Sequence, residues 1–137
     1  FDATNAAEYF GDDKLDFILA DVPCSGFGVI RKKPEVIYTK REEDILKIQK
    51  IQRDILDSVS KLVNLNGYIL YSTCTIFDEE NTQNIEWFLN KYPNFEAVDI
   101  SINENIIYTK DTYGGIKISY KNRYLDGFYI IKLKRVI

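Results

Sequence analysis

The sequence predicts an α/β fold built on a mainly parallel, doubly wound sheet. Short apolar stretches typical of buried strands alternate with segments whose apolar residues recur every three or four positions, as on the buried face of a helix. Polar loops that contain cysteine follow two of these strands. The length of 137 residues, 45% of them hydrophobic, allows a single domain over residues 1–137 with a core of moderate size.

The first predicted strand is Leu15–Asp21, LDFILAD, which closes on an acid. Continuous apolar character of this kind is typical of a strand buried on both faces of a parallel sheet. Residues Phe1–Asn5 before it read as the end of another strand running into a loop, and a loop with Pro23, Gly26 and Gly28 follows it. Because the chain begins with phenylalanine and has no methionine, we expect a piece of a longer protein.

A long amphipathic helix is predicted after this loop, beginning near Arg41. Its apolar residues recur at helical spacing over about six turns, and acids crowd its first turn, as the helix dipole favours. The apolar residues are Ile45, Ile48, Ile51, Ile55, Val59 and Leu62. The segment Asn64–Gly67 supplies the stop.

A second strand, Gly67–Ser72, and a second helix, Asp78–Lys91, come next, with Pro93 just beyond the helix. Strand, helix, strand, helix at this spacing indicates a doubly wound sheet. The residues Glu79–Asn81 are interpreted as a helix start that complements the helix dipole rather than as catalysts.

The last part of the chain has a different pattern. Phe95–Ile100 and Gly127–Lys134 are predicted strands, separated by a polar stretch that contains Gly114 and Gly115. Because no helix is predicted between the last two strands, we expect an antiparallel pair that closes the sheet.

Composition excludes several classes of protein and site. With no histidine and two cysteines, the chain cannot form a Cys/His zinc site, a Ser-His-Asp or Cys-His hydrolase site, or a disulfide framework, and we expect no metal. The longest apolar run is far short of the roughly 20 residues that span a membrane, so we expect a soluble, cytoplasmic protein without a membrane partner. The net charge of −3 is unlike that of most nucleic-acid binders.

Both cysteines fall just after predicted strands, where open α/β sheets bind their ligands. Cys24 follows Asp21 at the end of the first strand, and Cys74 follows the second strand. Three interpretations stay open at this point: small buried hydrophobic residues, a disulfide pair, or nucleophiles. The acid beside the first cysteine favours nucleophilic chemistry.

Three strings resemble the RNA cytosine-5 methyltransferases of the Sun (Fmu) type, in order and over nearly the whole chain. They are DVPCSGFGVIRKKPE, LNGYILYSTCTIFDEEN and DGFYIIKL. The family carries a D-(A/V)-P-C loop, a T-C loop before an E-E-N helix start, and a closing D-G-F strand, and the paired PC and TC motifs are highly specific. One departure is Lys121–Asp126, where the family commonly has a proline-containing turn.

The resemblance implies a Rossmann-like S-adenosylmethionine-dependent methyltransferase fold with strand order 3-2-1-4-5-7-6. This chain matches strands 4-5-7-6, with an antiparallel final strand, so residues 1–137 would be a partial catalytic domain without its amino-terminal half. The glycine-rich cofactor loop and the ribose-binding acid of the family would lie upstream. The S-adenosylmethionine site would then be incomplete and this piece inactive alone. Leu15 to Ala20 would become an exposed apolar edge, through which we expect self-association.

The resemblance also implies the reaction, which is methylation of cytosine carbon 5 in RNA through a covalent cysteine adduct. By motif, Cys74 matches the nucleophile that adds to carbon 6, and Cys24 matches the residue that helps release the product. The opposite assignment, as in DNA cytosine-5 methyltransferases, stays open. Asp21 matches an acid beside the methyl donor and target base, and Asp2 matches an acid at the adenine end of the cofactor. A loop cap or helix N-cap is the alternative role for these two acids.

The basic residues Arg31, Lys32 and Lys33 follow the first cysteine loop. Their charge alone indicates a solvated loop, whereas the resemblance implies contact with the phosphates of an RNA strand. The implied substrate is small-subunit ribosomal RNA in bacteria.

Two other functions stay open. A noncatalytic RNA-binding or scaffold protein would bind RNA but form no covalent adduct, and a thiol redox protein would couple Cys24 and Cys74 reversibly without a methyl donor. Amino-group methyltransferases share the sheet class, but they carry an aromatic residue after a D/N-P-P loop where this chain has Cys24.

Overall fold

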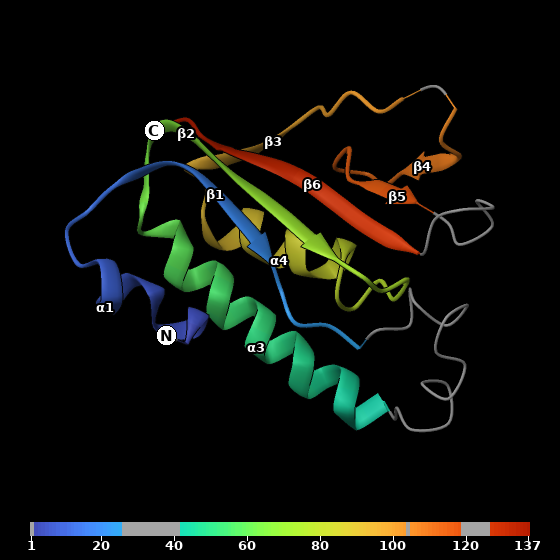
Figure 1. Ribbon diagram of the computed structural model, residues 1–137, viewed down its shortest axis with the longest axis horizontal. Helices are drawn as coiled ribbons and strands as arrows, with labels where there is room; N and C mark the ends of the chain where they lie inside the picture. The colour runs from blue at the N-terminus through green and yellow to red at the C-terminus, as the bar shows by residue number, and fades with distance from the viewer. Residues whose placement is uncertain (1, 26–41, 104, 119–126) are drawn as a thin grey trace.

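The chain forms a mixed α/β sheet with two long helices packed against it (Figure 1). The computed structural model describes residues 2–25, 42–103, 105–118 and 127–137. Its elements are η1 (Ala3–Asn5), α1 (Ala6–Phe10), β1 (Leu15–Asp21), α3 (Glu42–Ser60), β2 (Val63–Thr73), α4 (Thr82–Lys91), β3 (Phe95–Val98), β4 (Tyr108–Lys110), β5 (Ile116–Ile118) and β6 (Phe128–Arg135).

The strand order of the sheet is β1-β2-β6-β5-β4, and β3 pairs with β6 beside β5. Strands β1 and β2 are parallel, and α3 lies in the crossover between them. Strand β6 is antiparallel to β2, β3 and β5. The predicted antiparallel final strand and the predicted neighbours β1, β2, β6 and β3 are therefore confirmed.

The core lies between one face of this sheet and the helices α3 and α4. Register partners across the sheet, Ala20 on β1, Tyr71 on β2 and Ile131 on β6, point to that face and are buried. The helices contribute Ile55, Leu56, Val59, Ile85 and Phe88. The apolar spacing that predicted α3 therefore buries the second half of this helix, whereas Ile51 in the middle of the predicted apolar face is 43% exposed.

Two predictions about the first part of the chain are wrong. Residues 2–5 are not a strand end, because Asp2 caps η1 and α1 follows directly. A helix of five residues is too short to show the helical periodicity that would predict it. The bounds Leu15–Asp21 of β1 are confirmed, but the strand is not buried on both faces. It is the edge of the described sheet, and the side chains of Phe17 and Leu19 are 54% and 62% exposed.

The other element boundaries also differ from prediction. Strand β2 begins at Val63 rather than Gly67, because the polar segment that predicted a stop lies within the strand. There Asn66 takes a left-handed conformation with φ 68°, and the register with β1 shifts. Helix α4 begins at Thr82 instead of Asp78, and the polar stretch before β6 forms the hairpin β4–β5. None of the helices in the described part of the chain has the length and apolar character needed to cross a membrane.

Candidate active site

The carboxyl ends of β1 and β2 place the two cysteines in adjacent loops. We call residues 22–25 after β1 and 74–77 after β2 the cysteine loops. The backbone N–H of Val22 donates to the carbonyl of Ser72 at 3.1 Å, which continues the strand pairing to the last residues of both strands. Beyond it, the N–H of Cys74 donates to Sγ of Cys24 at 3.2 Å. Both cysteines are half-buried, and no disulfide joins them.

Asp21 is exposed at the end of β1, beside the cysteine loops. Its carboxylate Oδ1 accepts a hydrogen bond from Oγ of Ser72 at 2.9 Å, which leaves the other oxygen of the carboxylate oriented by this contact. The residue lies on the rim of a hollow of about 340 Å³. The other residues that line the hollow are apolar and come from η1, α1, β1, α3 and their flanking loops: Ala3, Ala6, Phe10, Leu15, Phe17, Ile18, Leu19, Ala20, Val22, Pro23, Ile55, Val59 and Leu62.

The lining of this hollow bears on whether it could take part of the nucleoside-containing methyl donor that the resemblance implies. Ligand pockets are mainly apolar and start at about 300 Å³, and a flat adenine ring is accommodated by walls of this kind. Asp21 is the single carboxylate among the lining residues, at the end next to the cysteine loops. The hollow therefore supplies apolar surface and one charged group, but few partners for the hydroxyl and amino groups of such a donor.

Asp2 lies directly before η1 and has a local structural role there. Its carboxylate Oδ1 accepts from the N–H and from the hydroxyl of Thr4, each at 2.9 Å, and so caps η1. The backbone hydrogen bond from Thr4 lowers the pKa of this exposed carboxyl. Asp2 is not among the residues that line the hollow. Its contact with a cofactor stays a prediction.

Behind the cysteine loops lies Glu80, whose side chain is fully buried. Its carboxylate Oε1 accepts from the N–H of Ser25 at 2.8 Å and from Nε2 of Gln52 at 3.1 Å. Its Oε2 accepts from the hydroxyl of Thr75 at 3.1 Å, and this hydroxyl lies 2.9 Å from Oγ of Ser25. Glu80 directly precedes Asn81, the N-cap of α4, as expected of a helix start, but the contacts of its side chain with both cysteine loops were not predicted.

Further buried polar groups extend this network into the core. The side chain of Gln52 on α3 also donates to the carbonyl of Pro23 at 2.9 Å, and it accepts from Nδ2 of Asn84 at 2.9 Å. The hydroxyl of Tyr71 donates to the carbonyl of Glu80 at 2.6 Å and accepts from Asn84 at 3.0 Å. Burial raises the pKa of the Tyr71 phenol well above its ordinary value. No local pattern in the sequence around Gln52, Tyr71 or Asn84 indicates this network.

The second cysteine loop has its own support from Asn81. The side chain of this residue accepts from the hydroxyl of Thr73 at 2.6 Å and donates to the carbonyl of Thr75 at 3.0 Å. The two contacts lie on either side of Cys74. The E-E-N string at residues 79–81 therefore supplies two residues that hold the cysteine loops, Glu80 and Asn81.

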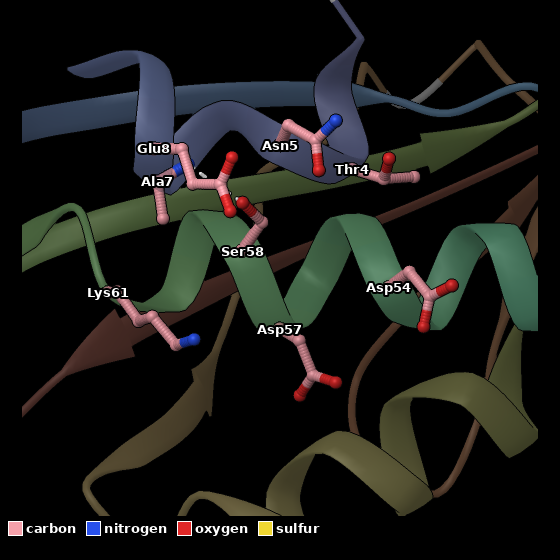
Figure 2. Close-up of a pocket in the computed structure, with 8 residues that line it drawn as sticks. All are labelled: Thr4, Asn5, Ala7, Glu8, Asp54, Asp57, Ser58 and Lys61. Carbon is pink, nitrogen blue, oxygen red and sulfur yellow. Dashed lines mark hydrogen bonds between the residues drawn. The ribbon is translucent and has the colours of Figure 1, made fainter. Parts of the chain in front are cut away.

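A separate polar groove runs between α1 and α3 (Figure 2). Ser58 accepts from the N–H of Ala7 at 2.8 Å and joins the two helices. Figure 2 shows Glu8 of α1 pointing toward Ser58, whereas Asp57 points away from α1. Asp57 contacts Lys91 on α4 at 2.8 Å. The groove is lined by Thr4, Asn5, Ala7, Glu8, Asp54, Asp57, Ser58 and Lys61, and no residue of the cysteine loops is among them.

Several residues of interest lie outside the described part of the chain. They are Gly26, Gly28, Arg31, Lys32 and Lys33 after the first cysteine loop, and the segment 121–126. The predicted RNA contacts therefore stay predictions. Among the described residues, no cluster of three or more His, Cys, Asp or Glu side chains has an arrangement that could hold a metal ion.

Comparison with known proteins gives a consistent result at the level of families. The sequence model of a family described as 16S rRNA methyltransferase RsmB/F matches residues 1–134. The chain is 37% identical over 139 residues to the probable ribosomal RNA small subunit methyltransferase B of Bacillus subtilis, covering 98% of this chain and 30% of that protein. It is 35% identical over 133 residues to ribosomal RNA small subunit methyltransferase B of Erwinia tasmaniensis, covering 96% and 29%.

Solved structures are similar to this chain over its whole length. The crystal structure of PH0851 matches with a TM-score of 0.88 and 36% identity, over 97% of this chain and 29% of that one. NSun6 from Pyrococcus horikoshii, whose structure was solved with SFG, matches with a TM-score of 0.85 and 26% identity, over 100% and 34%. The chain spans about 30% of the length of the two curated relatives from Bacillus subtilis and Erwinia tasmaniensis.

Proposed function

The chain belongs to the family described as 16S rRNA methyltransferase RsmB/F, and from this membership we propose that it is part of an enzyme that methylates carbon 5 of a cytosine in small-subunit ribosomal RNA. The methyl donor in this proposal is S-adenosylmethionine. The observation that carries it is the meeting of two cysteine loops at the carboxyl ends of parallel strands, with the carboxylate of Asp21 beside them.

The proposed reaction begins with the thiolate of Cys74. Cytosine carbon 5 is a poor nucleophile until a thiolate adds to carbon 6, because this addition moves the electrons of the 5,6 double bond toward carbon 5. The sulfur–carbon 6 bond forms in this step. Carbon 5 would then take the methyl group, whose bond to the sulfonium sulfur of the donor breaks with the electron pair left on that sulfur. Cys74 is half-buried after β2, so it is not sealed in the core as a purely structural cysteine would be.

Product release is the role we propose for Cys24. After methylation the proton on carbon 5 passes to a base, which in this proposal is the thiolate of Cys24; its bonding electrons restore the double bond, and the carbon 6–sulfur bond breaks with return of the electron pair to Cys74. The backbone N–H of Cys74 contacts Sγ of Cys24, which supports a role for this second thiol beside the proposed nucleophile. The geometry alone is equally compatible with exchanged roles, and the experiment below separates the two assignments.

The described residues suggest how the other reactants would be held. Asp21 would accept a hydrogen bond from the exocyclic amine of cytosine or contact the donor, and its orientation is fixed by Ser72. S-adenosylmethionine would supply an activated methyl group, with its apolar part in the hollow beside Asp21. Asp2 would contact its adenine end. Arg31, Lys32 and Lys33 would contact RNA phosphates, and ribosomal RNA places the activity in the cytoplasm.

The test uses the protein at its full natural length with an RNA segment in which cytosine is replaced by 5-fluorocytosine. Fluorine on carbon 5 cannot leave as a proton does, so the covalent adduct is trapped and migrates as a shifted band on a denaturing gel. Wild-type protein is compared with Cys74→Ser and Cys24→Ser, with and without S-adenosylmethionine. We expect the band with wild type and with Cys24→Ser, and its loss with Cys74→Ser.

The other outcomes identify the other functions. Loss of the band with Cys24→Ser alone would exchange the two cysteine roles. RNA binding without any band would indicate a noncatalytic scaffold. Reversible coupling of Cys24 and Cys74 that needs no methyl donor would indicate a thiol redox protein.

A further inference from the structure

A single buried carboxylate contacts both cysteine loops at the residues next to the cysteines. One oxygen of Glu80 accepts from the N–H of Ser25, which follows Cys24. The other oxygen accepts from the hydroxyl of Thr75, which follows Cys74. The two loops leave different strands of the sheet, so this carboxylate is a bridge between chain segments about fifty residues apart.

The cost of burying this group indicates that its contacts matter. A carboxylate removed from water is strongly destabilising unless hydrogen bonds satisfy it. Glu80 is fully buried, and none of the ion pairs between described residues includes it. Three donors compensate instead, from Ser25, Gln52 and Thr75. Packing alone does not explain a carboxylate here, because it is retained together with the three donors that compensate its burial.

Two further contacts make the bridge stiff. The hydroxyls of Ser25 and Thr75 lie 2.9 Å apart and close a ring with the Glu80 carboxylate. Gln52, which donates to Glu80, also donates to the carbonyl of Pro23 in the first loop. Gln52 on α3 therefore fixes the side chain of Glu80, and this side chain contacts both loops.

We propose that Glu80 is a positioning residue that fixes the distance between the thiols of Cys24 and Cys74. This inference rests on the proposed function, in which the two thiols act in turn on the same base. A displacement of either sulfur by about 1 Å would slow such chemistry by roughly 10- to 100-fold. Glu80 itself touches neither nucleobase nor donor in this proposal, and it acts through the backbone N–H of Ser25 and the hydroxyl of Thr75.

The experiment compares Glu80→Ala and Glu80→Gln with a matched pair at the preceding position, Glu79→Ala and Glu79→Gln. Glutamine keeps the bridge, because its carbonyl can accept from Ser25 while its amide donates to the hydroxyl of Thr75. Alanine removes both contacts. Glu79 has the same charge and is only half-buried, so its variants control for a change of charge near the loops.

The first measurement is the single-turnover rate of adduct formation with the 5-fluorocytosine RNA, beside the RNA dissociation constant. We expect Glu80→Ala to be slower by roughly 10- to 100-fold, with RNA affinity changed less than about twofold. Glu80→Gln and both Glu79 variants should keep about half of the wild-type rate or more. The proposal is overturned if Glu80→Ala reacts at the rate of Glu79→Ala, or if Glu80→Gln is as slow as Glu80→Ala.

A second variant covers a failure of Glu80→Ala to fold, which loss of a cooperative thermal transition would reveal. Thr75→Val keeps the shape of the side chain and removes the hydroxyl, which contacts Oε2 of Glu80, Oγ of Ser25 and the N–H of Phe77. We then expect Thr75→Val to slow adduct formation by about tenfold while Glu80→Gln does not. A Thr75→Val protein that reacts at the wild-type rate overturns the proposal.

Hydrogen exchange separates this inference from the proposed function. Glu80 does not contact the N–H of Cys74, which donates to Sγ of Cys24. If Glu80 fixes the two loops, Glu80→Ala should speed exchange in the peptide over residues 73–75 by about tenfold or more, and Glu80→Gln should not. If exchange changes in this way but the wild-type protein forms no covalent adduct, the bridge is supported and the methyltransferase chemistry is rejected. Unchanged exchange in Glu80→Ala would overturn the bridge whatever the activity.

Discussion

Each buried polar side chain in the described part of the protein has a hydrogen-bond partner. Around the cysteine loops these hydrogen bonds form a network, because three side chains each bond to more than one neighbour: Tyr71, Asn84 and Gln52. Removal of one member takes a hydrogen bond from each of its buried neighbours, which cannot turn to water for a replacement. At the scale of the single residue, we therefore expect large effects from small changes in this network.

Tyr71→Phe tests this expectation and its pH dependence. At pH 7 the variant should be less stable by about 1–3 kcal/mol, because Asn84 and the carbonyl of Glu80 lose the hydroxyl. Burial raises the pKa of Tyr71 in the folded protein, while the unfolded chain titrates at about 10. Above about pH 10 only the unfolded state releases this proton, so the wild type loses stability there and phenylalanine does not.

Urea unfolding of both proteins at pH 7, 9 and 11 measures this difference. The gap in unfolding free energy should be largest at pH 7 and narrow toward pH 11. Tyr108→Phe is the control, since Tyr108 is 37% exposed on β4. Loss of its hydroxyl should change the free energy of unfolding little at any of the three pH values. A gap for Tyr71→Phe that is constant with pH would contradict the prediction.

The sequence allowed part of the site to be predicted at this scale. The positions of Cys24 and Cys74 after successive strands are enough to bring them to one edge of a parallel sheet. Glu80 was interpreted as a helix-start residue that complements the helix dipole, because acids are common at that position. Its burial depends on Ser25 and Gln52, which lie far away along the chain, and no local pattern indicates such partners.

At the scale of the element, strong periodicity was the best guide. Strand β1, helix α3 and strand β6 were predicted close to their observed bounds, because each has an apolar pattern of sufficient length. Helix α1 and the β4–β5 hairpin are too short to show a pattern. The exposure of β1 on one face follows from its place at the edge of the sheet, which is a property of topology rather than of its apolar sequence.

The open edge at Leu15 to Ala20 leads to a prediction about association. The outer backbone groups of β1 pair with no described strand, and Leu19 is 62% exposed. We expect residues 1–137 to form dimers or larger species through this edge at high micromolar concentration. Leu19→Lys should shift the population to monomer, because a charged side chain on an edge strand opposes pairing.

Analytical ultracentrifugation of the two proteins measures this association. Leu46→Lys is the control, since Leu46 is similarly exposed, at 52%, but lies on α3. This substitution should leave the sedimentation of the chain unchanged. Wild-type chain that sediments as a clean monomer at high micromolar concentration would count against edge pairing.

At the scale of the whole molecule, the chain spans about 30% of the length of its relatives. The hollow beside Asp21 is lined almost entirely by apolar side chains. Polar groups of S-adenosylmethionine would find few partners there, so we expect residues 1–137 alone to show no binding in the low micromolar range. Isothermal calorimetry with the protein at full natural length as the positive control tests this expectation, and low-micromolar binding by the chain alone would contradict it.

For the whole molecule, the order of the strands in the sheet was predicted more accurately than the packing of side chains on the two faces of the sheet. Resemblance to a known family implied the order β1, β2, β6, β3, and the pairing confirms it. Short motifs at fixed spacing carry this information because they follow particular strands. Packing of the sheet faces and of the groove between α1 and α3 depends on side chains from several elements, which motifs do not specify.

The contact between Cys74 and Cys24 joins residues 50 positions apart, with the whole of α3 between them. Contacts so distant along the chain carry a high loop-closure entropy and form late in folding. While the chain is being synthesised, Cys24 emerges well before Cys74, and neither strand pairing nor the Glu80 bridge can exist. The paired thiols are thus a product of completed folding, and an incompletely folded chain cannot have a working pair.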